Sequence, residues 1–235
     1  MGKYIYFVTS AKDMSTVFKN TAQLTFDEYV QNISIRIGMS PSSLHNLWKA
    51  PSEEHLARVN AFPNPSKKNV AHLGEIILKT QLHPGEQAEQ LWGSVLENMH
   101  IRLSWKHLEE SPAILPTGKG IVLSLRKLLF STLVESSTTS FFGQELLSIE
   151  PKLLDYFETF DESSWKLSYR VPKSWAKDML TAKTQVSTAL QKYASISADA
   201  KSDACWMIRT LESELHDAGL HSHDIGLQLL LLYWV

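Results

Sequence analysis

Cysteine is almost absent from this sequence. Among its 235 residues only Cys205 is a cysteine, so we expect no disulfide partner, and the cysteine-rich class of zinc site is excluded. Such sparse use of cysteine fits a reducing compartment. Cys205 stands at helical spacing beside Trp206 and Ile208, which favours a buried structural thiol over a nucleophile or a metal ligand.

The sequence also lacks an excess of charge of one sign and a long apolar run. The formal net charge is -2, with 20% charged residues, so the overall charge gives no sign of a nucleic-acid partner. The longest apolar run, Leu229 to Val235, is far shorter than the roughly 18 apolar residues that span a bilayer. We therefore expect no transmembrane segment in this chain.

What the sequence does contain is helical periodicity. Hydrophobic residues make up 43% of the chain, enough for one large domain with a core, and most of them recur at helical spacing. We predict a mainly α fold, with one short N-terminal strand over Tyr4 to Thr9. The expected helices are 11–19, 25–38, 44–49, 53–60, 69–82, 86–103, 118–138, 152–160, 175–193, 203–218 and 225–235. The first of these would bury Met14, Val17 and Phe18 on one face.

Local motifs for catalysis or metal binding are weak. The Gly118-Lys119-Gly120 turn lacks the spacing of a phosphate-binding loop. A group of imidazoles and carboxylates has spacing that a metal site could use, but it fits the polar ends of helices better: His216, Asp217, His221, His223 and Asp224. We therefore assign no catalytic residue and no metal ligand from local motifs.

The last segment, Ile225 to Val235, is apolar around its whole circumference. A helix of this kind is buried in a core when it is too short for lipid. The segment has no C-terminal stop signal, which predicts that the chain is a fragment. On that hypothesis one side of this helix lies uncovered.

Several stretches, taken in order, resemble one protein family. YIYFVTSAKDMSTVFKN (4–20) resembles an early strand and the following helix of a cytochrome P450. FFG (141–143), LDYFETFD (154–161) and WKLSYRVPK (165–173) resemble fungal members akin to sterol 7-hydroxylases and prostacyclin synthase. HDIGLQLLLLYWV (223–235) resembles the first half of their long central helix. The resemblance covers essentially the whole chain.

The resemblance implies one partial cytochrome P450 domain over residues 1–235, the helical half up to the first part of the central helix. The N-terminal anchor and the C-terminal haem-binding half are missing, since no F-x-x-G-x-x-x-C-x-G loop and no E-x-x-R motif occurs. The complete enzyme would be a haem-dependent monooxygenase on the cytoplasmic face of the endoplasmic reticulum membrane, served by an NADPH-dependent reductase. We expect this chain itself to bind no haem stably and to be inactive.

The resemblance also implies site residues. The helix 69–82 would pass the haem propionates, where His72 and Lys79 share a face two turns apart; solvent-facing charges are the alternative. The segment 225–235 would line a cavity for a small apolar substrate, lipid-like or sterol-like, with Leu231 or Trp234 closest to the haem. The expected pocket residues are Gln228, Leu231, Leu232 and Trp234. Gln228 would bind a substrate oxygen or a neighbouring helix.

A competing hypothesis needs no missing half. The chain would be a non-enzymatic α-helical protein that binds lipid or acts as a scaffold. This hypothesis predicts a closed core in which the segment 225–235 is covered, whereas the fragment hypothesis predicts that one side of the same segment is uncovered.

Overall fold

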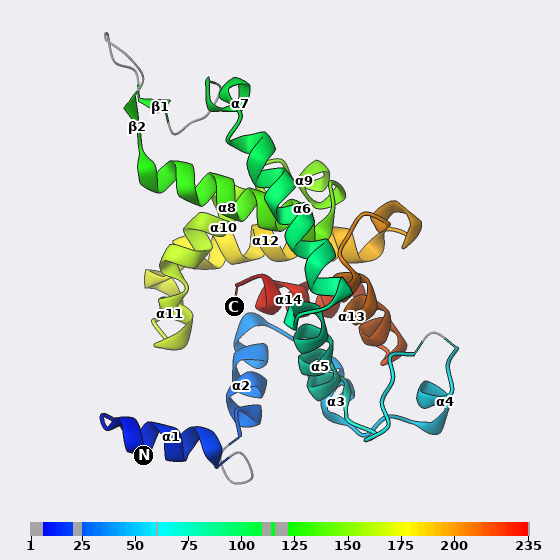
Figure 1. The fold of residues 1–235 in the computed structure, drawn as a ribbon. Coiled ribbons are helices and arrows are strands. Elements are labelled where there is room, and N and C mark those ends of the chain that lie inside the picture. The colour runs from blue at the N-terminus through cyan, green and yellow to red at the C-terminus, as the bar shows by residue number, and fades with distance from the viewer. Residues whose placement is uncertain (1–6, 21–24, 60, 110–113, 116–121, 235) are drawn as a thin grey trace.

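The computed structural model describes residues 7–20, 25–59, 61–109, 114–115 and 122–234, and their fold is mainly α (Figure 1), as predicted. The helices before residue 110 are α1 (Ala11–Lys19), α2 (Asp27–Ile37), α3 (Pro41–Trp48), α4 (Glu53–Leu56), α5 (Val70–Leu82), α6 (Glu86–Arg102) and α7 (Trp105–Glu109). Those after it are α8 (Leu125–Phe142), α9 (Glu145–Ile149), α10 (Leu153–Ser163), α11 (Trp165–Ser168), α12 (Lys177–Ser195), α13 (Trp206–Asp217) and α14 (Ser222–Trp234), with 3-10 helices η1 (Lys173–Trp175) and η2 (Asp199–Lys201).

A short antiparallel strand pair joins β1 (Ile114–Leu115) to β2 (Val122–Leu123), at a place where no strand was predicted. The strand expected over residues 4–9 is not found at 7–9, and 4–6 lie outside the described residues, as does the turn 118–120. The helix expected from residue 118 begins at Leu125 instead, after the N-cap Ser124.

Side-chain caps explain where the predicted helices begin. The Asn69 side chain accepts a hydrogen bond from the backbone N–H of His72 at 3.0 Å, which satisfies one of the free donors in the first turn of α5. α2 ends at Gly38, whose φ of +107° a residue with a side chain adopts only with strain. Such caps are short-range, so the sequence alone predicts them well.

α14 lies in the middle of the core and packs mainly on α12 (Figure 1). Gly226 is the point of closest approach, since a Cβ atom there would come within 2.7 Å of the backbone nitrogen of Gln191 in α12. Ile225, Leu229 and Leu230 have no exposed surface. The expectation that one side of this helix lies uncovered is therefore wrong for its first and middle turns, because α12, α13 and α2 contact the helix. Leu232, Tyr233 and Trp234 in the last turn are only half-buried.

A carboxylate fixes the N-terminal end of α14 to α3. Asp224 accepts hydrogen bonds from the backbone N–H of Ser40 at 3.1 Å and from the hydroxyls of Ser40 and Ser43, each at 2.7 Å. Burial by itself raises the pKa of Asp224, but the hydrogen bonds from the two serines outweigh it and hold the pKa below its ordinary value. The ionised carboxylate is thus the form that the fold stabilises.

α1 differs from the other long helices because none of its residues is buried. The prediction that Met14, Val17 and Phe18 are buried is wrong, since these side chains are 42%, 41% and 73% exposed. Periodicity shows which residues share a face of a helix, but not whether another element covers that face. None of the described helices has both the length and the apolar content needed to cross a membrane.

The close approach at Gly226 predicts a specific effect of a single methyl group. Gly226→Ala should lower the free energy of unfolding by about 1–3 kcal/mol, because the backbones of α14 and α12 must move apart. The matched control is Gly93→Ala in α6, where an added Cβ meets nothing within 4 Å and should stabilise by about 0.5–1 kcal/mol. Urea unfolding followed by circular dichroism measures both. Equal stability of the Gly226→Ala protein and the wild type would contradict this packing.

The Asp224 cap predicts a pH-dependent loss of stability. Asp224→Ala should lower the free energy of unfolding by about 2–3 kcal/mol at neutral pH, because Ser40 and Ser43 lose a charged acceptor. Since the folded pKa lies below the ordinary value of 3.8, the difference from wild type should be constant above that value and shrink as the pH falls through the folded pKa. Asp161→Ala, an exposed change in α10, is the control. Urea titrations across acid pH that show no such convergence would refute the assignment.

Candidate functional site

Two adjoining cavities lie beside the C-terminal half of α14. The first, which we call the His72 cavity, has a volume of about 520 Å³. It lies among α2, α3, α5, α13 and α14, and its principal lining residues are Val30, Ile33, Leu47, Trp48, Val70, His72, Leu78, Leu211, Leu215, Gln228, Leu231, Leu232 and Trp234. Its wall is mostly apolar, and the titratable side chains Asp27, His72 and Glu75 come from α2 and α5.

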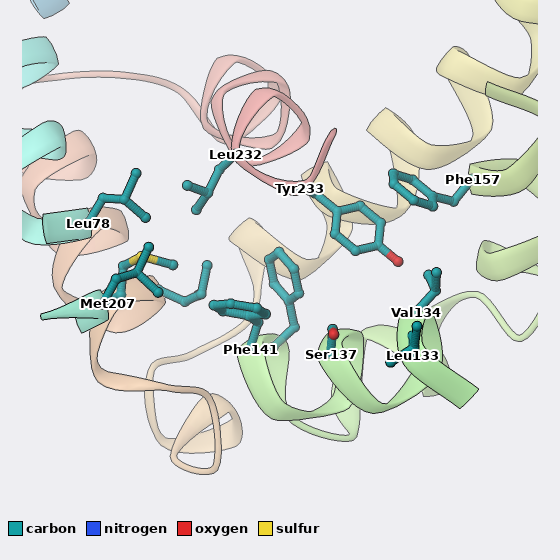
Figure 2. Close-up of a pocket in the computed structure, with 12 residues that line it drawn as sticks. Leu78, Leu133, Val134, Ser137, Phe141, Phe157, Met207, Leu232 and Tyr233 are labelled. Atoms are coloured by element: carbon teal, nitrogen blue, oxygen red, sulfur yellow. The ribbon is translucent and has the colours of Figure 1, made fainter. Parts of the chain in front are cut away.

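The second cavity, the Tyr233 cavity, has a volume of about 500 Å³ (Figure 2). It is lined by residues of α5, α8, α10, α13 and α14: Leu78, Leu82, Leu133, Val134, Ser137, Phe141, Phe142, Phe157, Met207, Ile208, Leu232 and Tyr233. Figure 2 shows the Tyr233 ring between Phe157 and α8. Leu78 and Leu232 line both cavities, so the two cavities are neighbours beside the last turns of α14.

The structure brings together most of the residues predicted for a ligand site. Gln228, Leu231, Leu232 and Trp234 all line the His72 cavity, and His72 lines it from the opposite helix. These residues come from segments more than 150 positions apart in the chain, which local motifs cannot connect. Lys79 is the exception, because it does not line either cavity.

The polar groups of the two cavities are few and distinct. The Gln228 side chain is half-buried and has no hydrogen-bond partner among the residues that the structure describes. The Tyr233 hydroxyl lies 2.6 Å from the Thr138 hydroxyl, and its ring contacts those of Phe157 and Phe142. Burial raises the pKa of Tyr233 to about 12, so the phenol stays neutral. Sparse polar groups in an apolar wall are typical of sites that orient apolar ligands.

The two basic side chains predicted to contact haem propionates, His72 and Lys79, have carboxylate partners. The Nε2 atom of His72 lies 3.1 Å from Asp27, and Lys79 lies 3.9 Å from Glu75 on an exposed surface. Burial opposes ionisation of Asp27, yet hydrogen bonds from His72 and Thr25 lower its pKa. A propionate at either side chain would have to compete with a carboxylate already in place.

The described residues do not fit a haem group by themselves. Cys205 lines neither cavity. A cysteine that ligates haem iron must be a thiolate, but burial raises the pKa of the Cys205 thiol to about 11. Nor do the described residues place three or more potential metal-ligating side chains together. No chemical step through haem is therefore derived from these residues.

Several cavity residues were not among those predicted. Leu78, Phe141, Phe157 and Met207 line the Tyr233 cavity from four different helices. Phe141 and Phe157 belong to stretches that carried the family resemblance, but nothing local assigns them to a pocket. Their role depends on which helices meet, and that is settled by tertiary packing.

The comparisons with known proteins identify no relative. No protein-family model, no curated protein and no solved structure matches the chain.

The raised pKa of Tyr233 predicts a late alkaline titration. The phenolate absorbance that disappears in a Tyr233→Phe variant should titrate near pH 12, because burial raises the pKa of this phenol. Because the folded pKa lies above the ordinary value of 10.0, the contribution of the neutral phenol to stability should hold below that value and fall as the pH rises through the folded pKa. If the absorbance that is missing from the Tyr233→Phe variant titrates near pH 10 while the protein is still folded, the phenol is exposed and the assignment is wrong.

Proposed function

We propose that this chain binds a small apolar molecule, lipid-like or sterol-like, in the two cavities beside α14. The observation that carries the proposal is the convergence of Gln228, Leu231, Leu232 and Trp234 on one wall of the His72 cavity. Each cavity, at about 500 Å³, falls within the range of about 300–1,000 Å³ that ligand pockets occupy. In the His72 cavity Gln228 would bind a ligand oxygen. In the Tyr233 cavity the Tyr233 hydroxyl, which donates to Thr138, would accept a hydrogen bond from a ligand hydroxyl.

We further propose that the bound molecule is the substrate of a haem-dependent monooxygenase, and that this chain forms part of the substrate pocket. The resemblance to cytochromes P450 supports this, since it implies that the segment 225–235 lines the cavity. The haem would be ligated by residues outside this sequence, and an NADPH-dependent reductase would supply electrons. Membrane attachment at the endoplasmic reticulum belongs to the same proposal.

One observation favours the second candidate, a non-enzymatic protein that binds lipid or acts as a scaffold. α14 is covered by helices of this chain rather than left open on one side, which is the arrangement that this hypothesis expects. The monooxygenase candidate and the lipid-binding form of the second candidate both need the apolar ligand, and they differ in whether haem chemistry follows. A scaffold needs no such ligand.

Ligand binding is tested with the purified chain. We expect it to bind a long-chain fatty acid or a sterol in isothermal titration calorimetry. Trp234→Ala should weaken binding about tenfold, because a ligand loses a large apolar contact. Trp206→Ala removes a half-buried indole that packs on Phe62 outside both cavities and should leave affinity unchanged. Equal losses in both variants would show a general effect on folding, and no binding at all would refute the proposal.

The proposal that this chain belongs to a haem-dependent monooxygenase has a separate test. The reading frame of the parent gene beyond Val235 should encode a haem loop of the F-x-x-G-x-x-x-C-x-G type. The chain alone, mixed with haem and reduced, should give no thiolate-type carbon monoxide spectrum, because the pKa of Cys205 is raised. A gene without the loop would leave the non-enzymatic candidate, and a thiolate-type band from the chain alone would overturn the assignment of the haem ligand to other residues.

A further inference from the structure

The wall of the His72 cavity is unequal in charge. The side chains there that carry charge near neutral pH are the carboxylates of Asp27 and Glu75 and the imidazole of His72, and none of the described residues that line the cavity is a lysine or an arginine. Carboxylates are ionised at neutral pH, and one imidazole offsets at most one of the two negative charges. The wall is therefore negative whether His72 is neutral or protonated.

Asp27 is the carboxylate that the fold holds at this cavity. The Nε2 atom of His72 lies 3.1 Å from it, and the side chains of Asp27 and His72 are 35% and 34% exposed. Burial raises the pKa of Asp27, but the hydrogen bonds from His72 and Thr25 outweigh it and lower the pKa below its ordinary value. The carboxylate is thus fixed in place, partly shielded from water and ionised.

Two cations lie close to the cavity but outside it. Lys79 lies 3.9 Å from Glu75, and its side chain is 68% exposed, so water screens its charge. Arg36 donates to the backbone carbonyl of Ser168 at 3.2 Å but does not line the cavity itself. A ligand head group in the cavity therefore meets the carboxylates without an intervening lysine or arginine.

Aromatic side chains line the same cavity as the carboxylates. Tyr29, Trp48 and Trp234 contribute to its wall from α2, α3 and α14. The ring centroids of Trp48 and His72 are 5.4 Å apart, so Trp48 and Asp27 both contact His72. The face of an aromatic ring attracts a cation, and aromatic rings around an ammonium group are a recurrent form of recognition. The rings and the carboxylates thus favour the same sign of charge on a ligand.

Gln228 does not select between ligand head groups. Its side chain, half-buried and without a hydrogen-bond partner among the described residues, carries both a carbonyl acceptor and an amide donor. It can therefore bind an ammonium, a hydroxyl or a carboxylate. The sign of the charge on the cavity wall is then what decides which of these head groups binds most tightly.

We propose that the preferred ligand of the His72 cavity is a protonated amine with a single apolar body, such as a long-chain alkylammonium ion. The ammonium group would lie beside Asp27 and Trp48, and the apolar body would extend along Leu231 and Trp234. An alcohol of the same shape keeps the apolar contacts but gains nothing from the charge, and a carboxylate is repelled. This inference rests on the proposed function, since it names the class of molecule that the cavity takes.

Three probes with chains of equal length test this preference: decylamine, decanol and decanoate, each titrated into the full chain by isothermal titration calorimetry at neutral pH. We expect decylamine to bind about tenfold more tightly than decanoate, with decanol between them, because only the head group differs. Added salt should narrow the difference, since it screens the charges of Asp27 and Glu75. Decanoate still binds through its chain, so the preference is one of degree.

Removing one charge with little change of shape identifies the group responsible. Asp27→Asn should weaken decylamine binding about fivefold, strengthen decanoate binding and leave decanol binding unchanged. Glu75→Gln should act in the same direction but more weakly, because that carboxylate is 62% exposed. Glu28→Gln is the matched control. It removes the adjacent, exposed carboxylate of α2, which does not line the cavity, and this variant should bind all three probes as the wild type does.

The outcomes separate this inference from the proposed function. If none of the three probes binds, both fail. If decanoate binds as tightly as decylamine, the proposed function stands and the preference for an amine is wrong. Equal losses of decylamine affinity in Asp27→Asn and Glu28→Gln would show attraction to the net charge of the chain, and would also overturn the inference. If Asp27→Asn weakens decanol binding as well, that substitution has disturbed the fold, and Glu75→Gln alone decides.

Discussion

The backbone contact between α14 and α12 at Gly226 is the constraint on which the other features depend. Because the two helices come closest at the glycine, Asp224 to Leu227 in the N-terminal half of α14 are buried, and Asp224 reaches Ser40 and Ser43 at the start of α3. The C-terminal half then extends to the junction of α5, α8 and α13, where the two cavities form. A wider separation of α12 and α14 would displace every cavity wall that α14 contributes. The packing of one helix thus determines both the stability of the core and the position of the candidate site.

Local features of this fold could be predicted from the sequence, and non-local ones could not. The caps and glycines around α2 and α5 act within one helical turn, so they marked the helix ends closely. The burial of α14 was misjudged because the helices that cover it lie elsewhere in the chain. The sequence of a uniformly apolar helix does not indicate which elements pack against it. The same reason explains Phe18 in α1 and Trp92 in α6, which follow helical periodicity and yet are exposed. The pair β1–β2 involves two residues on each strand, too few for a period-2 pattern.

The candidate site was predicted in part. Four residues of α14 were assigned to a pocket from a family resemblance, and they share a cavity wall with His72. Lys79 was grouped with His72 because the resemblance places the helix 69–82 beside the haem propionates and the two residues share a face of it. The structure places Lys79 on an exposed surface beside Glu75, which is the alternative that the sequence left open. The groove lined by Arg36, Lys166, Arg170 and Lys173 was not predicted, because a balanced net charge says nothing of how charge is distributed. Together these features describe a helical protein with an apolar interior site and a separate cationic surface.

The central claim is that an apolar ligand occupies the space beside the C-terminal half of α14. Photo-cross-linking with a fatty acid that carries a diazirine at the middle of its chain, followed by peptide mapping, tests this most directly. We expect modification of the peptide that contains Leu231 to Trp234, together with peptides of α5 or α8 that contain Leu78 or Phe141. Unlabelled fatty acid in excess should suppress the modification. Labelling confined to exposed surfaces such as Phe18 or Trp175, with α14 unmodified, would contradict the account.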